Sequence, residues 1–152
     1  MAFRIRVVTP SVVDEDGDPH AAGEFTFGHA RLFFRVDLRR WGVANYEAQW
    51  KSAVERLVRG AAATAMLTSY RGPGDVTHIG WALWREDNWV YAQKQSFCPV
   101  ELTEPFDPWN PDVHVGLRLP VTEEQLPIQE WRADSVHLFA AAFGVRLPHL
   151  PP

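Results

Sequence analysis

NYEAQWKSAVERLVRG occupies residues 45–60 and has the strongest periodicity in the chain. Its apolar side chains recur at the i, i+4, i+7 and i+8 spacing of one helix face. Asn45 is placed to cap the first free amide groups, and Gly60 to take the left-handed conformation that closes a last turn. The segment therefore predicts an amphipathic helix that buries one stripe of side chains against a sheet: Tyr46, Trp50, Ala53, Val54, Leu57 and Val58.

Segments on both sides of this helix have strand patterns. Residues 62–70 form a short apolar run bounded by glycines, which is typical of a buried central strand. Residues 78–96 predict a hairpin, because Asp87 and Asn88 suit the two central positions of a type I′ turn. Further strands are expected at residues 3–7, at residues 24–38 with a break at Gly28, and at residues 113–119.

A second helix is predicted near the C-terminus, where Asp134 is placed to cap it and apolar residues follow at helical spacing. Hairpins combined with two widely separated helices do not repeat as βαβ units. The predicted fold class is therefore α+β, an antiparallel sheet with the mid-chain amphipathic helix packed on it and the second helix near the C-terminus.

Length and composition indicate one ordinary globular domain. The chain has 152 residues, of which 46% are hydrophobic and 22% charged, so we expect residues 1–152 to form a single domain. No apolar run approaches the roughly 18 residues that cross a bilayer, and the first residues lack a signal-peptide pattern. The single cysteine, Cys98, agrees with a reducing compartment. We therefore expect a cytoplasmic protein without membrane contact.

The charges are unevenly distributed along the chain. Residues 1–75 carry ten Lys or Arg against nine Asp or Glu, whereas residues 76–152 carry five against ten. An acidic half is a poor surface for phosphates, which disfavours direct binding to nucleic acid. It would attract a basic macromolecule instead.

Motifs for catalysis or metal binding are not found in the sequence. The histidines are far apart and show no metal-ligand spacing, and Cys98 has no neighbouring base or cation. We therefore expect a protein that is not an enzyme and holds neither metal nor cofactor. One alternative is a small-molecule enzyme or carrier with a pocket between sheet and helix, in which His78 and His114 converge beside an aromatic wall. A regulatory binding module is another.

Four stretches, taken in order, resemble the immunity proteins of bacterial contact-dependent growth inhibition, the CdiI type. Residues 46–60 are similar to the family's Tyr-x-x-Gln-Trp helix with its Leu-x-x-Gly ending. The others are residues 66–70, the hairpin segments 81–85 and 90–93, and Arg118 followed by residues 128–134. The resemblance covers about residues 45–143. It implies a small cytoplasmic immunity protein that binds the C-terminal domain of a cognate toxin, often a nuclease, and blocks it stoichiometrically without catalysis.

Residues 101–112 are the first candidate for toxin binding, because loops on a rigid scaffold carry partner specificity. The carboxylates would set the rate of encounter with a basic toxin, and two aromatic side chains would anchor it. The candidate residues are Glu101, Glu104, Asp107 and Asp112, with Phe106 and Trp109. A second acidic loop is the next choice, with Asp14, Glu15, Asp16 and Asp18.

Overall fold

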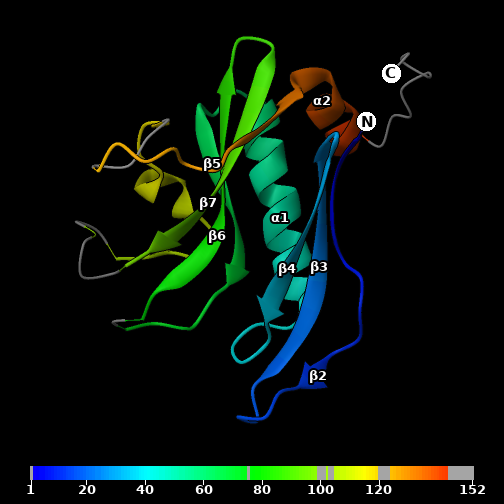
Figure 1. The fold of residues 1–152 in the computed structure, drawn as a ribbon, viewed down its shortest axis with the longest axis vertical. Helices are drawn as coiled ribbons and strands as arrows, with labels where there is room; N and C mark the ends of the chain where they lie inside the picture. The colour runs from blue at the N-terminus through cyan, green and yellow to red at the C-terminus, as the bar shows by residue number, and fades with distance from the viewer. Residues whose placement is uncertain (1, 75, 99–101, 103–104, 120–123, 144–152) are drawn as a thin grey trace.

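The computed structural model describes residues 2–74, 76–98, 102, 105–119 and 124–143. It contains two four-stranded antiparallel sheets with the long helix α1 (Val43–Val58) between them (Figure 1). Sheet A consists of β1 (Ala2–Val7), β2 (Val12–Val13), β3 (Pro19–Gly28) and β4 (Ala30–Asp37). Sheet B has the order β5 (Ala63–Ser69), β6 (His78–Glu86), β7 (Trp89–Phe97) and β8 (Trp131–Asp134). The chain also forms the 3-10 helix η2 (Pro111–His114) and the helix α2 (Ser135–Phe143).

The predicted α+β class is confirmed, but the strands divide between two sheets where a single sheet was expected. The strands that precede α1 in the chain form one sheet, and those that follow it form the other. Strand β3 is the central strand of sheet A, because β1 and β2 pair with one of its edges and β4 pairs with the other. Within the described residues, the structure has no helix with the length and apolar character of a membrane span.

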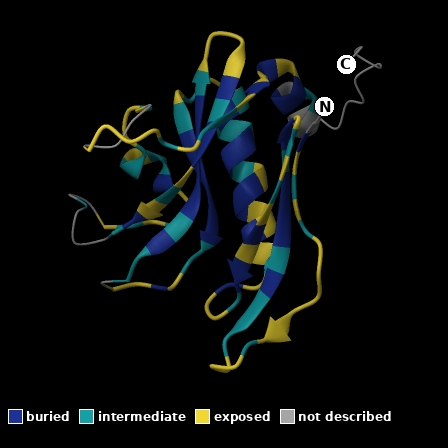
Figure 2. Cartoon of the chain, viewed as in Figure 1, coloured by how far each residue is buried: buried dark blue, intermediate teal, exposed yellow. Residues whose placement is uncertain are grey.

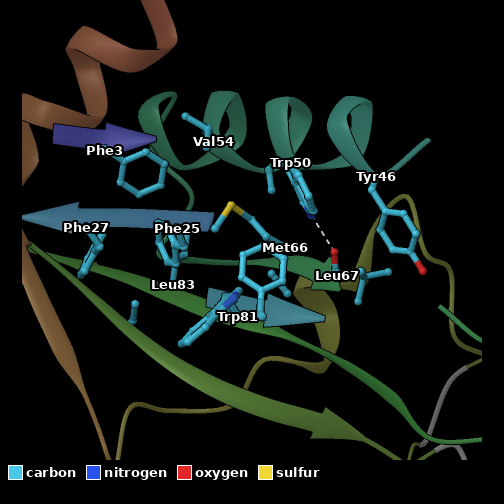
Figure 3. Close-up of a cluster of buried hydrophobic side chains, with 14 of the residues drawn as sticks. Phe3, Phe25, Phe27, Tyr46, Trp50, Val54, Met66, Leu67, Trp81 and Leu83 are labelled. Carbon is cyan, nitrogen blue, oxygen red and sulfur yellow. Dashed lines mark hydrogen bonds between the residues drawn. The ribbon is translucent and has the colours of Figure 1, made fainter. Parts of the chain in front are cut away.

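The core fills the space between the two sheets around α1 (Figure 3). The predicted helix stripe is confirmed, because its members from Tyr46 to Leu57 are buried, and Val58 packs partly buried beside them. Sheet A contributes Phe25, whose ring centroid lies 5.4 Å from that of Trp81 on sheet B. Aromatic contacts of this kind link the two sheets directly.

Local hydrogen bonds form at both ends of α1. The prediction that Asn45 caps the helix is wrong, because the helix begins at Val43 and its N-cap is Gly42. The Asn45 Oδ1 instead accepts a hydrogen bond of 3.1 Å from the backbone N–H of Gly42. At the other end, the N–H of Gly60 donates to the carbonyl of Leu57 and that of Ala61 to the carbonyl of Arg56. Gly60 has a φ of 115°, so this is the glycine-terminated C-cap that the sequence predicted.

Side chains of α1 also cover the free edge of β5, the edge strand of sheet B. The Gln49 amide donates to the carbonyl of Ala65 at 2.8 Å and accepts from the N–H of Leu67 at 2.9 Å. The Trp50 indole N–H donates to the carbonyl of Leu67 at 2.6 Å, as Figure 3 shows. An exposed strand edge invites pairing with other chains, and these bonds close it.

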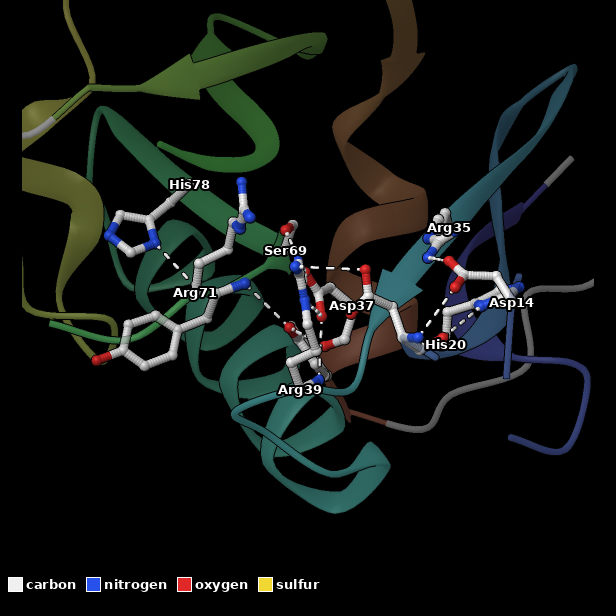
Figure 4. A network of polar contacts seen from close by, with 11 residues as sticks. Asp14, His20, Arg35, Asp37, Arg39, Ser69, Arg71 and His78 are labelled. Atoms are coloured by element: carbon white, nitrogen blue, oxygen red, sulfur yellow. Dashed lines mark hydrogen bonds and ion pairs between the residues drawn. The ribbon is translucent and has the colours of Figure 1, made fainter. Parts of the chain in front are cut away.

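A polar network joins sheet A, sheet B and α1 (Figure 4). The buried Asp37 on β4 accepts hydrogen bonds from the Arg39 guanidinium and from the Ser69 hydroxyl on β5. The Tyr46 hydroxyl donates to the carbonyl of Asp37 at 2.5 Å and accepts from the N–H of Tyr70. Burial is the largest single effect and acts to raise the Asp37 pKa. The hydrogen bonds and charge of Arg39, together with the Ser69 hydrogen bond, outweigh it, so the pKa lies below its usual value.

Two sequence predictions need correction. The hairpin has the predicted two-residue connection, with Glu86 opposite Trp89, but φ is positive at Asp87 and not at Asn88, so the turn is not type I′. The strand predicted at residues 113–119 is wrong: residues 111–114 form η2, and residues 115–119 belong to no strand. Residues 115–119 lie on the outer face of sheet B. Their carbonyls accept hydrogen bonds from the side chains of Trp84 and Gln93, and not from the backbone of a neighbouring strand.

Candidate functional site

The predicted loop is anchored to sheet B by a stack of rings. The Phe106 ring stacks on His78 with centroids 4.2 Å apart and on His114 at 5.6 Å. His78 also stacks on Tyr70, and its Nδ1 accepts a hydrogen bond from the backbone N–H of Arg71 (Figure 4). Burial, reinforced by the Arg71 charge, lowers the pKa of His78. Phe106 is therefore an internal anchor of this loop.

Asp112 is also held by contacts inside the molecule. Its carboxylate accepts hydrogen bonds from the Arg56 guanidinium on α1, at 2.6 Å and 3.1 Å, and from the N–H of Ala65 at 3.2 Å. The Ala65 bond adds to the closure of the β5 edge. Asp112 thus fixes the end of the loop to α1 and to sheet B.

Asp107 and Trp109 point to solvent from the anchored loop. The Asp107 carboxylate accepts a hydrogen bond of 2.9 Å from the N–H of Trp109, which orders the turn between them. Trp109 is 45% exposed, and its ring lies 4.9 Å from that of Trp41. Two further candidates, Glu101 and Glu104, lie outside the described residues. The structure thus divides the described candidates into two internal anchors and two exposed side chains.

Residues 113–119 extend the exposed surface beyond the loop, and sequence reasoning missed them as site residues. The Trp84 indole donates to the carbonyl of Gly116 at 2.9 Å, and the Gln93 amide to that of Leu119 at 3.1 Å. Three apolar side chains of this segment face solvent, with exposed fractions of 59% for Val113, 87% for Leu117 and 57% for Leu119. The alternating apolar pattern of this segment predicted a strand. Because the segment pairs with no strand, the same pattern leaves these apolar side chains exposed.

Arg118, near the end of this segment, binds to the β6–β7 hairpin, whose tip is exposed (Figure 2). Its guanidinium lies 3.7 Å from the centroid of the Tyr91 ring and makes ion pairs of 2.8 Å with both Glu86 and Glu130. The Glu86 hydrogen bond is the largest of several effects that raise the Arg118 pKa. We call the exposed residues Asp107, Trp109, Val113, Leu117 and Leu119 the loop surface.

The second acidic loop is a turn organised by Asp14. The Asp14 carboxylate accepts hydrogen bonds from the N–H groups of Asp16 and Asp18 and from the Arg35 guanidinium, which lies 2.6 Å away. The Arg35 bond is the largest of the effects that lower the Asp14 pKa to about 2. The Asp14 carboxylate is occupied by hydrogen bonds within the turn and to Arg35, whereas Glu15 and Asp16 are exposed.

The alternative function, a small-molecule enzyme or carrier with a pocket at His78 and His114, receives no support from the geometry. His78 and His114 are brought into one cluster, but both stack on the Phe106 ring. In the part of the chain that the structure describes, there is no group of three or more His, Cys, Asp or Glu side chains that could hold a metal ion. The cluster is an aromatic anchor.

An anchored loop that exposes a tryptophan, a carboxylate and several aliphatic side chains has the composition of a protein-binding surface. The protein therefore falls in the class of small α+β binding proteins. A family model described as the CdiI N-terminal domain matches residues 36–140, and the chain belongs to this family. The family resemblance drawn from the sequence is confirmed, and the matched region begins somewhat earlier than residue 45.

The fold is also similar to that of a chain in a solved structure, the "CdiA-CT/CdiI toxin and immunity complex from Enterobacter cloacae". The TM-score is 0.83 at 19% sequence identity, over 94% of this chain and 97% of that one. The match includes most of sheet A, to which the sequence resemblance did not extend. No curated protein matches the chain.

Proposed function

We infer that this chain is an immunity protein that binds the C-terminal domain of a cognate toxin and neutralises it by stoichiometric protein–protein interaction. The observation that carries this inference is membership of the CdiI family over residues 36–140. The solved chain of similar fold comes from a toxin and immunity complex, which supports the same function.

The proposed action is binding alone, by one immunity domain spanning residues 1–152, in the cytoplasm where an incoming toxin would act. The family resemblance implies a toxin that is often a nuclease. No cofactor or metal is required for this action. The packing of α1 against both sheets supports treating the chain as one unit, because the core between them is continuous.

We place the toxin contact on the acidic loop at residues 101–112, continued by Val113, Leu117 and Leu119. Trp109 and the aliphatic side chains would fill apolar hollows of the toxin, while Asp107, Glu101 and Glu104 would attract its basic side chains. Phe106 and Asp112 fix the loop to the rest of the molecule through their contacts with His78 and Arg56. The loop at Asp14, Glu15, Asp16 and Asp18 stays the second choice.

The test is co-expression with the cognate toxin domain, followed by binding kinetics with the purified domains. Trp109→Ala should speed dissociation by at least about tenfold if the ring is an interface anchor, because tenfold corresponds to about 1.4 kcal/mol. Charge reversal at Glu101, Glu104 and Asp107 should slow association, and added salt should reduce that difference.

Val13→Ala is the matched control, since Val13 is an exposed apolar residue (66% exposed) on sheet A. A parent chain that neither binds nor protects would overturn the proposed function. Protection and kinetics that are unchanged in folded variants of the loop would instead overturn only the placement of the surface.

A further inference from the structure

The outer face of sheet A, turned away from α1, is built from arginines around one carboxylate. Arg4 and Arg6 on β1 lie beside Thr26 and Glu24 on β3, and Arg31 and Phe33 on β4 lie beside the same two residues from the other side. All four flanking side chains are exposed: 56% for Arg4, 47% for Arg6, 64% for Arg31 and 63% for Phe33. We call these four residues the arginine face.

Positive charge exceeds negative charge at this place. The Glu24 carboxylate lies 2.8 Å from the Arg31 guanidinium, 3.6 Å from that of Arg4 and 3.7 Å from that of Arg6. The Arg31 hydrogen bond is the largest of the effects that lower the Glu24 pKa, so the carboxylate stays ionised and offsets one of three positive charges. Three guanidiniums carry about fifteen N–H donors, whereas a carboxylate accepts about four hydrogen bonds. Most of these donors are therefore available to an incoming acceptor.

Phe33 adds an apolar contact to this charged face. Its ring is exposed in the middle of β4, with the Arg31 guanidinium 5.2 Å from the ring centroid. Arginine and aromatic side chains are enriched at protein interfaces and carry much of their binding energy. Arg31 and Phe33 together offer a bidentate donor beside an apolar ring.

The surroundings favour a compact acidic partner over a long phosphate chain. Arg35, the next outward residue of β4, is paired with Asp14 of the acidic turn, so carboxylates border the face at that end. The whole chain has a formal net charge of −4, which would repel an extended polyanion beyond the face. The planar donor geometry of guanidinium groups suits carboxylates and phosphates alike, so the preference rests on these surrounding charges.

We propose that the arginine face is a docking surface for an acidic patch of a partner protein, in which several carboxylates surround one apolar side chain. The carboxylates bind to the free donors of Arg4, Arg6 and Arg31, and the apolar side chain packs on Phe33. The arginine face is separate from the loop surface, which lies on sheet B. Binding of an acidic partner to the arginine face does not depend on binding of a toxin to the loop surface.

The probe is an acetylated peptide with two glutamates on each side of one leucine, titrated into the full-length ¹⁵N-labelled chain at low salt. Backbone amide shifts should move at residues 4, 6, 31 and 33. A second peptide with serine in place of leucine should bind more weakly, because it offers no side chain to Phe33.

Arg4→Gln/Arg6→Gln leaves Arg31, the nearest cation to Glu24, in place and should weaken binding by at least about fivefold, since charge-assisted bonds are lost. Arg59→Gln/Lys94→Gln removes the same charge from exposed sites elsewhere and should leave binding unchanged. Phe33→Ser should abolish the difference between the two peptides, and its exposed position keeps this variant informative if the arginine variant fails to fold.

The proposal would be overturned if the leucine peptide shifted backbone amides throughout the chain. It would also be overturned if the Arg4→Gln/Arg6→Gln variant bound that peptide as tightly as the parent. A thymidylate hexamer that binds this face as tightly as the leucine peptide would replace the acidic protein with a nucleic acid as the partner.

Discussion

Trp50 contributes to the fold in two ways through one side chain. It is 1% exposed, its ring lies 5.9 Å from that of Phe34 on sheet A, and its indole N–H donates to Leu67 on sheet B. The residue therefore links the helix to both sheets, by packing on one side and by a hydrogen bond on the other.

Trp50→Ala should lower the free energy of unfolding by about 3–5 kcal/mol, the usual cost of deleting a buried aromatic side chain. The loss combines a cavity with an unpaired carbonyl at Leu67. Urea unfolding of the parent and the variant measures it, and equal midpoints would contradict the assignment.

His78 should make stability depend on pH. Its pKa is lowered in the folded chain, whereas the unfolded chain has the ordinary value of about 6.5. As the pH falls below that value the unfolded state takes up the proton first, so the free energy of unfolding should decrease between about pH 7 and pH 5. His78→Phe keeps a ring in the stack with Tyr70 and Phe106, and its unfolding free energy should change less over the same interval. Identical slopes for the two chains would assign the pH dependence to other groups.

At the scale of elements, the contact between α1 and β5 combines apolar packing with hydrogen bonds to a strand edge. Tyr46, Gln49 and Trp50 each bond a backbone group of β5 or of Tyr70, the residue that follows it. Asp112 reaches the same edge from η2. Sheet B is thereby closed on this side without a further strand.

Gln49→Ala should leave the Ala65 carbonyl and the Leu67 N–H buried without a partner, at about 1–3 kcal/mol for each unsatisfied group. Glu47→Ala, on the exposed face of the same helix, is the control and should change stability by no more than about 0.5 kcal/mol. Chemical denaturation of both variants checks the prediction, which fails if the two lose the same stability.

At the scale of the whole molecule, the two outer faces differ in chemistry. Sheet A carries the arginine face, and sheet B carries the loop surface with its tryptophan, its aliphatic side chains and one carboxylate. The inner faces of both sheets and α1 share one apolar core. Each outer face therefore suits a different kind of partner.

Acid should destabilise the folded chain through three paired carboxylates. Asp14 titrates at about 2, and the pKa values of Glu24 and Asp37 are also lowered, whereas unfolded carboxyls titrate near 4. Their contribution is present above the unfolded values and is lost as the pH falls through the folded ones. The free energy of unfolding should therefore decrease from about pH 5 to pH 2. Asp37→Asn should show a shallower decrease in urea titrations across this range, and an equal slope would exclude Asp37 as a contributor.

Much of the fold could be predicted from local pattern. The stripe along residues 46–58, the hairpin at 78–96 and the helix that follows Asp134 all depend on neighbours a few positions apart, and the structure has all three. The family resemblance rested on the same segments. Within the candidate site, Trp109 and Asp107 could be proposed because a loop between patterned segments is expected to be exposed.

Other features depended on the tertiary structure alone. Arg56 lies outside the apolar stripe predicted for α1, and the pattern gives no sign that it pairs with Asp112, 56 positions away. Gln49 likewise bonds a strand edge that no periodicity marks. Alternating apolar residues at 113–119 predict a strand only if a neighbour offers its backbone, and here side chains of sheet B take that place. Local spacing fixes helices, hairpins and their apolar faces, because those interactions lie close in sequence. Which polar groups meet, and which apolar residues stay exposed, is decided by the packing of segments that are distant in sequence.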